Sequence, residues 1–328
     1  MDDWVEKRKG KISASNVAAI LGLKPFGKTP IDAWQQIMGY APPAPDKPAF
    51  RMGRKVESVI AELYAEEAGV ELVTLKDPMI HPLLPWLCGT PDRLILGQPK
   101  GLEIKNVGQH MARGWGEPGT DEIPDYYLTQ VAIYMAITGY DAFDVVASLA
   151  GAYPVVYPVC RDEELENKIL KALDEWYVLH IAGNTPPEPD GTSNYTEYLK
   201  HRWPRNEKPL RTADPMIELA MANLDEARRD CNEAEERKAL YENTIKAYIG
   251  DADGVQGGCG SITWKAAKDS KKVDYEGITS LLFKLSGVQE VLQKHELTSS
   301  IIVSDYTLII PGSRRFLTKF FDKLKVGG

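Results

Sequence analysis

Long hydrophobic runs and paired cysteines are both missing from this chain of 328 residues. No apolar run approaches the ~20 residues that a membrane-spanning helix needs, and the polar N-terminus does not resemble a signal peptide. The cysteines lie far apart and form no CxxC pair, which makes zinc or iron–sulfur ligation unexpected; they are Cys88, Cys160, Cys231 and Cys259. We therefore expect a cytoplasmic protein without membrane contact, whose cysteines are free and buried.

The chain also lacks a surplus of positive charge. It contains 39 Lys and Arg residues and 47 Asp and Glu residues, which gives a formal net charge of -8. Nucleic-acid binding usually requires a surplus of cations, so this balance weighs mildly against it. It does not exclude it, because a nuclease places carboxylates around its metal ions and a local basic groove can coexist with an acidic exterior. Residues 7–11 and 314–325 carry basic clusters, although either is equally well explained as a solvated surface.

The rest of the composition is that of an ordinary globular protein, with 43% hydrophobic and 26% charged residues. The length favours two domains, and the Gly- and Pro-rich segment 183–191 predicts a linker between domains 1–190 and 191–328. In the second domain, small and apolar residues recur every three or four positions along a helix at about 213–249, interrupted by Lys238. We expect that helix to pack on a partner helix, and the remainder to form a small α/β region.

Apolar spacing and glycine stops predict the individual elements. The clearest helix is 53–68, where Val56, Ile60 and Tyr64 share one face and Gly69 ends the helix. Further helices are expected at 16–21, 30–38, 124–138 and 162–182, and strands at 71–75, 79–81, 93–96, 102–106, 143–149 and 153–159. In the second domain we expect a loop at 250–260, strands at 261–265, 300–310 and 315–321, and helices at 278–285 and 288–295. This order of elements predicts an α/β (α+β) fold.

The candidate site lies in the predicted hairpin formed by 93–96 and 102–106. Successive side chains of a strand point to opposite faces, so Glu103 and Lys105 share one face, and the intervening turn brings Asp92 to the same place. Two carboxylates beside one ammonium are what a Mg²⁺ site for phosphodiester hydrolysis needs. Strands disfavour Glu, and burying its charge is unfavourable, so Glu103 has little structural reason to be there unless a metal ion binds it.

Five sequence blocks in order resemble the YqaJ-type viral recombinase family, the lambda exonuclease type, within the PD-(D/E)XK nuclease superfamily. The blocks are RKGKISAS at 8–15, MGRKVE at 52–57, TPD at 90–92, LEIK at 102–105 and QVAIY at 130–134. The resemblance covers residues 4–182 and implies a PD-(D/E)XK, restriction-endonuclease-like core, with a central mixed sheet flanked by helices and, here, a C-terminal helical plus small β extension. The family's acidic residue shortly before the Pro-Asp block has no counterpart in residues 81–86.

The resemblance implies a set of metal ligands. They are Asp92, Glu103, the backbone carbonyl of Ile104 and Glu57, the last directly or through water, around two Mg²⁺ ions that Mn²⁺ is expected to replace. Lys105 would hold and polarise the attacking water, either as a general base or as an electrostatic stabiliser. Taken singly, Glu57 is better explained as an exposed helix charge, while Asp92 and Lys105 have alternatives as a turn residue and a strand-edge lysine.

The flanking blocks imply contacts with DNA. Gln130 and Tyr134 lie four apart on one helical face, and the resemblance places both beside the active site, although a place in the core explains Tyr134 equally well. The arginine of the family that matches Arg8 recognises the 5′-phosphate of a DNA end. The hydroxyl positions near that phosphate are Ser13, Ser15 and Thr90, and capping of the following helix is an alternative for the two serines.

The resulting prediction is a Mg²⁺-dependent exonuclease that acts on the ends of double-stranded DNA, degrades 5′ to 3′ and leaves 3′ single strands. The resemblance further implies a ring-shaped homo-oligomer, typically a trimer, a single-strand annealing protein as partner, and a phage or prophage gene expressed in the bacterial host cytoplasm. The alternatives are a structure-specific or restriction-type endonuclease on the same core and a non-catalytic DNA-binding regulatory module. The intact set of Asp92, Glu103 and Lys105 weighs against the latter.

Overall fold

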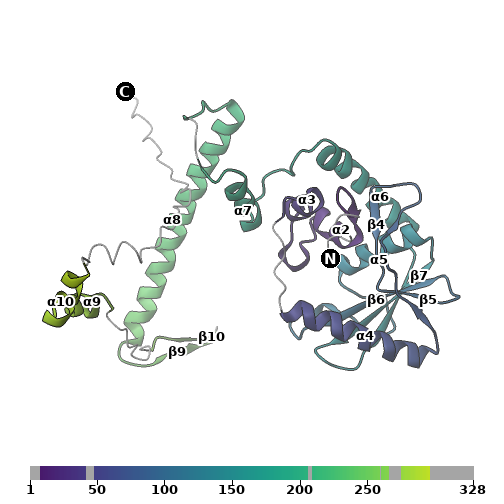
Figure 1. The fold of residues 1–328 in the computed structure, drawn as a ribbon, viewed down its shortest axis with the longest axis horizontal. Helices are drawn as coiled ribbons and strands as arrows, with labels where there is room; N and C mark the ends of the chain where they lie inside the picture. Colours follow the sequence, from purple (N-terminus) through teal and green to yellow (C-terminus); the bar gives the residue numbers. More distant parts are fainter. Residues whose placement is uncertain (1–7, 42–47, 206–208, 259, 266–274, 296–328) are drawn as a thin grey trace. The chain divides into compact units, whose positions relative to one another are not determined.

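The computed structural model describes residues 8–41, 48–205, 209–258, 260–265 and 275–295 (Figure 1). The chain divides into two compact units, Met1–Trp203 and Pro204–Gly328. All the candidate site residues belong to the first unit. Among the described residues, no helix combines the length and the apolar character that crossing a membrane requires.

A five-stranded mixed sheet forms the centre of the first unit, in the strand order β2-β5-β6-β7-β8. The strands are β2 (Leu72–Val73), β5 (Arg93–Ile95), β6 (Lys100–Val107), β7 (Ala142–Leu149) and β8 (Val155–Cys160). β6 and β7 run parallel, whereas the other neighbours are antiparallel. The parallel pair is joined through helix α5 (Asp125–Thr138), as a crossover between parallel strands requires.

Helices cover both faces of this sheet, so the predicted α/β class with a central mixed sheet is confirmed. On one face, Leu102 and Ile104 of β6 form a buried cluster with Ile60 of α4. Because alternate residues of a strand face opposite ways, Glu103 and Lys105 lie on the other face, towards α5. The remaining helices of the unit are α2 (Ala14–Ile20), α3 (Pro30–Met38), α4 (Pro48–Ala68), α6 (Glu163–Trp176) and α7 (Ser193–Arg202).

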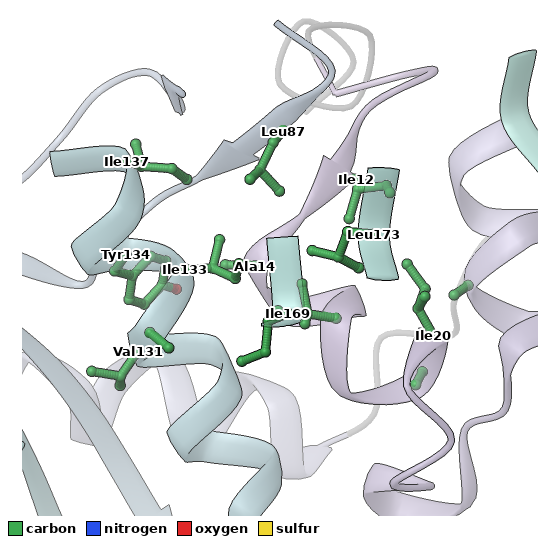
Figure 2. Packing of buried hydrophobic residues seen from close by; sticks show 14 of the residues in the cluster. Ile12, Ala14, Ile20, Leu87, Val131, Ile133, Tyr134, Ile137, Ile169 and Leu173 are labelled. Carbon is green, nitrogen blue, oxygen red and sulfur yellow. The ribbon is translucent and has the colours of Figure 1, made fainter. Parts of the chain in front are cut away.

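A second, three-stranded sheet in the order β1-β4-β3 belongs to the larger core on the α5 side. Its strands are β1 (Ile12–Ser13), β4 (Leu87–Gly89) and β3 (Met79–Ile80). Figure 2 shows Ile12 and Leu87 of neighbouring strands in one cluster with Ile133 of α5 and Leu173 of α6, and all four side chains are 0% exposed. This core fixes β1 against β4, and therefore holds the segment that follows Ile12 beside the segment that leads to the Pro-Asp turn.

The sequence located most helices of this unit but missed several short elements. The helix ends at Gly39 and Gly139 are confirmed, since both glycines have a positive φ (75° and 71°) that other residues rarely adopt. α4 begins at Pro48 rather than at residue 53, a position where proline is well tolerated. The predicted helix 162–182 is α-helical only as far as Trp176 and continues as a π-helical segment, Tyr177–Ala182. β1 and β4 were not predicted, because two or three residues are too few to show a period.

α7 follows the predicted linker and yet packs against the first unit. The side-chain amide of Asn194 donates to the carbonyl of Gly27 at 3.0 Å and to the carboxylate of Asp32. The ring of Tyr198 lies edge-on to Trp34, with 5.8 Å between the ring centroids. The compact unit therefore runs to Trp203. The functional division into domains 1–190 and 191–328 stays a prediction.

The second unit contains a long helix and a small β-hairpin. Its elements are α8 (Pro215–Ile249), β9 (Gly254–Gly257), β10 (Gly260–Thr263), α9 (Tyr275–Lys284) and α10 (Ser286–Lys294). The predicted long helix is confirmed, whereas the predicted loop 250–260 is wrong in part, because β9 pairs with β10 in an antiparallel hairpin. The predicted strands 300–310 and 315–321 and the basic cluster 314–325 lie outside the described residues.

The cysteines only partly meet expectation. Cys88, Cys160 and Cys231 are free, and only Cys88 is buried. The expectation of burial is therefore wrong for Cys160, at the end of an edge strand, and for Cys231, on the solvated surface of α8. Cys259 lies outside the described residues.

Candidate active site

The hairpin of β5 and β6 brings two carboxylates together. Its register pairs Arg93 with Leu102, which sets Asp92, the residue before β5, opposite Glu103. Asp92 Oδ2 accepts a hydrogen bond of 2.7 Å from the backbone N–H of Ile104. One carboxylate is therefore held in place by the backbone of the strand that carries the other.

Glu103 is almost completely removed from solvent, with 2% of its surface exposed. Its Oε1 accepts hydrogen bonds from Lys105 Nζ and, at 2.8 Å, from Gln130 Nε2. Its Oε2 is buried and has no hydrogen-bond partner within the described part of the chain. A buried carboxylate oxygen without a partner is unfavourable, so a positively charged ligand at this position would stabilise the site.

Helix α5 extends the network away from the sheet. Gln130 Nε2 also donates to Tyr134 Oη at 2.8 Å, and Tyr134 Oη donates to the backbone carbonyl of Thr90 at 3.1 Å. The two side chains lie on one helical face, and Tyr134 is 3% exposed, so it is both a core residue and a member of the network. This chain of hydrogen bonds fixes α5 to the segment just before Asp92.

Lys105 is enclosed between carboxylates and an aromatic ring. Its Nζ lies 4.7 Å from the centroid of the Tyr127 ring, which is within range of a cation–π attraction. Burial acts to lower the pKa of Lys105, but the charges of Glu103 and Asp92 and the hydrogen bond to Glu103 outweigh burial and raise that pKa. Lys105 is therefore held in its ammonium form.

Arg93 and Glu57 form an ion pair next to Asp92. Arg93 Nη1 donates to Glu57 Oε1 at 2.9 Å and to the backbone carbonyl of Asp92. Glu57, on α4, is therefore tied to the Pro-Asp turn through Arg93 rather than directly to Glu103. Its expected contribution to metal binding stays a prediction.

A pocket of about 350 Å³ opens beside Asp92. The residues that line it include Glu57, Arg93, Tyr134, Arg8, Ser15 and Thr90. Arg8 Nη2 donates to Ser15 Oγ at 3.4 Å, and Ser15 Oγ lies 3.0 Å from the hydroxyl of Ser13. Three of the four predicted phosphate-binding residues (Arg8, Ser15 and Thr90) and part of the predicted metal site therefore line the same pocket.

The hydroxyl groups of this region are not used as helix caps. Ser13 occupies the position before α2, but its side chain makes no capping hydrogen bond. Ser15 lies within the helix, so the capping alternative is wrong for both serines. Thr90 Oγ1 is buried without a hydrogen-bond partner among the described residues.

The donor set fits a hard divalent cation. Within the described segments, no group of three or more His, Cys, Asp or Glu side chains is placed to hold a metal ion. Mg²⁺ does not require such a group, because it is commonly bound through one or two carboxylates, with water and phosphate oxygens as its other ligands. Burial, followed by the charge of Glu103, raises the pKa of Asp92 well above its usual value. A divalent cation between Asp92 and Glu103 would relieve both effects.

Two residues of this site were not singled out from the sequence. Arg93 directly follows the Pro-Asp turn, and its charge beside Asp92 was an available signal. Tyr127 precedes Gln130 by three positions, and residues three apart share a helical face. The contact between Tyr127 and Lys105 depends on how α5 crosses β6, which no local pattern encodes.

Two solved structures of exonucleases are distantly similar to this chain. The alkaline exonuclease LHK-Exo from Laribacter hongkongensis is 19% identical, with 62% of this chain and 97% of that chain covered and a TM-score of 0.46. A phage related exonuclease from Haemophilus somnus 129PT is 16% identical, with 53% and 96% covered and a TM-score of 0.40.

Sequence relatives give a closer match. The uncharacterized protein YqaJ of Bacillus subtilis (strain 168) is 29% identical over 262 residues, which cover 77% of this chain and 79% of the relative. This match is longer than the first unit, Met1–Trp203, so it includes part of the second. Residues 3–141 match the model of the YqaJ-like viral recombinase domain, a range that contains all the site residues described above. Over residues 3–141 the chain is therefore similar to the YqaJ-like viral recombinase domain, and over a longer range it is similar to the YqaJ protein of Bacillus subtilis.

Proposed function

We propose that the first unit is a Mg²⁺-dependent deoxyribonuclease that acts on double-stranded DNA ends, degrades 5′ to 3′ and leaves 3′ single-stranded overhangs. The observation that carries this proposal is the convergence of Asp92, Glu103 and Lys105 beside a pocket. Two carboxylates and an ammonium are the groups that metal-assisted phosphodiester hydrolysis needs. The similarity of residues 3–141 to a viral recombinase domain supports DNA as the substrate.

The carboxylates hold the metal ions in this proposal. Asp92, Glu103 and the carbonyl of Ile104 are the ligands, and Glu57 contributes directly or through water. Two Mg²⁺ ions, or Mn²⁺ in their place, supply an activated water and stabilise the leaving 3′-oxygen when bound. The fit rests on the all-oxygen donor set and on the buried Oε2 of Glu103, which lacks a protein partner within the described residues.

The neighbouring side chains orient the reacting groups. Lys105 directs its ammonium at the attacking water and offsets the negative charge of the pentacovalent transition state. Gln130 holds Glu103 in position and is near enough to orient phosphate or water, and Tyr134 fixes Gln130 through a 2.8 Å hydrogen bond. In this arrangement, α5 contributes the side chains that orient the reacting groups, and the hairpin of β5 and β6 contributes the charged side chains.

The pocket supports recognition of a phosphorylated 5′ end. The guanidinium of Arg8 matches a terminal phosphate in shape and charge, and the hydroxyls of Ser13, Ser15 and Thr90 lie in the same region. Because this pocket also reaches Asp92, a phosphate bound by Arg8 would present a nearby phosphodiester bond to the carboxylates. This supports degradation of the 5′-ended strand.

The assembly and the cellular setting are proposed from the family alone. They are a ring-shaped homo-oligomer, typically a trimer, a single-strand annealing protein that receives the 3′ strand, and a phage or prophage gene expressed in the bacterial cytoplasm.

Digestion of end-labelled DNA tests this function. We expect Mg²⁺-dependent release of nucleotides from the 5′ end of linear duplex, faster with a 5′-phosphate, and no cleavage of covalently closed circular duplex. Arg8→Gln should remove the preference for the 5′-phosphate while activity on unphosphorylated ends remains. Cleavage of the circular duplex would contradict the proposal and indicate an endonuclease. DNA binding without any Mg²⁺-dependent hydrolysis would contradict it as well and indicate a non-catalytic DNA-binding module.

A further inference from the structure

α8 is a helix of 35 residues with nearly all of its side chains exposed. Its own side chains stabilise it locally: Asp214 caps its N-terminus, and ion pairs such as Arg229–Asp225 at 2.8 Å link successive turns. A helix solvated on all sides is normally polar on all sides. α8 is not, since Tyr241 is 64% and Tyr248 is 80% exposed. Within the described residues, this helix lacks a partner that covers its apolar side chains.

Apolar and small residues form a regular seam along this helix, most of them exposed and two of them, Leu224 and Ile245, half-buried. Ten positions separated alternately by three and four residues run the length of the helix: Ile217, Ala220, Leu224, Ala227, Cys231, Ala234, Lys238, Tyr241, Ile245 and Tyr248. This is the a/d pattern of two helices wound around each other, with Ile217 at an a position. Three successive d positions are alanine, which allows the backbone of a facing helix to approach closely. Leu219 and Leu240 lie outside the seam.

We propose that α8 binds the α8 of a second copy of this chain as an antiparallel helix pair. In a parallel pair in register, equivalent a positions face each other, so the two copies of Lys238 would meet inside the seam. In the antiparallel pair that sets Ile217 against Tyr248, an a position faces a d position, and Lys238 lies against Ala227 of the second copy. The antiparallel pair therefore avoids the repulsion between two lysines that the parallel pair would place inside the seam.

The charges that flank the seam favour the same arrangement. In the antiparallel pair, Asp230 approaches Arg237 of the second copy, and Arg228 approaches Glu235 of the second copy, so each contact joins opposite charges. By symmetry each contact occurs twice. In the parallel pair, Asp230 would approach Glu235, which is repulsive, while Arg237 would approach Glu242, so only one of its two charged contacts joins opposite charges. This charge complementarity identifies a second copy of the chain as the occupant of the seam.

Cross-linking of the full-length protein tests the direction. In a background without reactive cysteines, Ala220→Cys and Ile245→Cys are made in separate proteins, because the antiparallel pair sets these two positions against each other. We expect cross-linked dimers only when the two proteins are mixed. Dimers formed by either protein alone, in particular by Ala220→Cys, would establish the parallel pair and overturn the proposal. Absence of cross-links in the mixture would overturn it as well, and would leave another segment of the chain or a different protein as the occupant.

Charge reversal provides an independent test of the contacts. Glu235→Arg should weaken self-association, measured by sedimentation, by roughly tenfold because two attractive contacts become repulsive. Arg228→Glu combined with Glu235→Arg should restore it, since the pair is reformed with opposite signs. Glu236→Arg makes the same change of net charge on the face opposite the seam and should have no effect. A double variant that stays as weak as the single variant, with unchanged helix content by circular dichroism, would refute the antiparallel contact. The readout does not involve nuclease activity, so it is independent of the proposed DNA hydrolysis.

Discussion

Two buried carboxylates lie on adjacent parallel strands of the central sheet, Glu103 on β6 and Asp144 on β7. They are 2% and 4% exposed, and each has one buried oxygen without a hydrogen-bond partner in the described residues. Each is also paired with a lysine: Glu103 with Lys105, and Asp144 with Lys100 at 2.8 Å. Judged by burial, charge pairing and incomplete hydrogen bonding, the two are alike.

Their surroundings differ in one decisive respect. Glu103 faces a second carboxylate, Asp92, beside a pocket, and burial, followed by the charge of Glu103, raises the pKa of Asp92. Asp144 instead accepts a 2.7 Å hydrogen bond from Tyr64 of α4, and burial, followed by this carboxylate, raises the pKa of Tyr64 so that it remains a donor. In the cluster around Glu103, a bound cation would relieve the repulsion between two carboxylates. In the cluster around Asp144, the carboxylate connects helix α4 to the sheet. A second carboxylate, rather than burial, marks the candidate site.

The largest expected effect separates the two carboxylates by activity. Glu103→Gln keeps the shape of the side chain but removes the charge of the proposed metal ligand, so nucleotide release from linear duplex should fall on the order of a thousandfold or more. Asp144→Asn should retain most of the activity per folded molecule, because it changes a contact between α4 and the sheet. Initial rates at saturating Mg²⁺, corrected for the folded fraction, measure both.

A comparable loss of activity in the two variants would remove the distinction drawn between the clusters. Undiminished Mg²⁺-dependent release by Glu103→Gln would refute the site assignment itself. DNA binding by the inactive variant serves as the control that the pocket is intact.

The next effect concerns stability in the presence of metal. If Mg²⁺ binds only the folded state, a concentration one hundred times the dissociation constant adds about 2.7 kcal/mol to the free energy of unfolding. Glu103→Gln and Asp92→Asn should lose most of this increment, and Asp144→Asn should keep it. Urea unfolding with Mg²⁺ and with EDTA gives the increment for each protein. If the stabilisation by Mg²⁺ disappears in Asp144→Asn but persists in Glu103→Gln, the metal ion binds at Asp144 rather than at Glu103.

A smaller effect distinguishes the clusters in the absence of metal. Asp144→Asn weakens the partly exposed ion pair with Lys100 and the buried hydrogen bond from Tyr64, so the protein should lose about 1–3 kcal/mol of stability. Glu103→Gln should lose less or gain, because repulsion with Asp92 ends at the same time as the pairing with Lys105. Urea unfolding in EDTA compares the two. Equal losses would mean that Asp92 and Glu103 do not repel each other in the folded protein.

The sequence predicted Glu103 but not Asp144, and the reason is physical. The hairpin of β5 and β6 is local, so strand periodicity and a short turn suffice to bring Asp92 opposite Glu103. The contact of Asp144 with Tyr64 joins residues 80 positions apart and depends on how α4 crosses the sheet. Side-chain packing across layers decides such contacts, and a single sequence contains no period that reports it.

The same limit applied to the rest of the site. Local pattern and family resemblance named the side chains on β6 and α5, and the helix and strand boundaries in this region were close to those observed. The ion pair between Arg93 and Glu57 and the ring of Tyr127 beneath Lys105 are contacts between layers, and both were missed.

The smallest effect concerns this aromatic contact. Tyr127 packs against Trp115, with ring centroids 5.4 Å apart, and so presents a fixed ring surface to Lys105. Tyr127→Leu removes the cation–π attraction that helps to position the Lys105 ammonium. The rate should therefore fall about twofold to thirtyfold, as expected for a loss of ~0.5–2 kcal/mol. The decrease should be in kcat with little change in KM, because the ring orients Lys105 rather than binding DNA.

Tyr127→Phe is the matched control, since it keeps the ring and removes only the hydroxyl, and its rate should stay close to that of the unmodified protein. If Tyr127→Phe is as slow as Tyr127→Leu, the hydroxyl rather than the ring is what matters at this position. If neither variant is slowed, two carboxylates position Lys105 without help from α5, and the site depends on the hairpin of β5 and β6 even more completely than the contacts suggest.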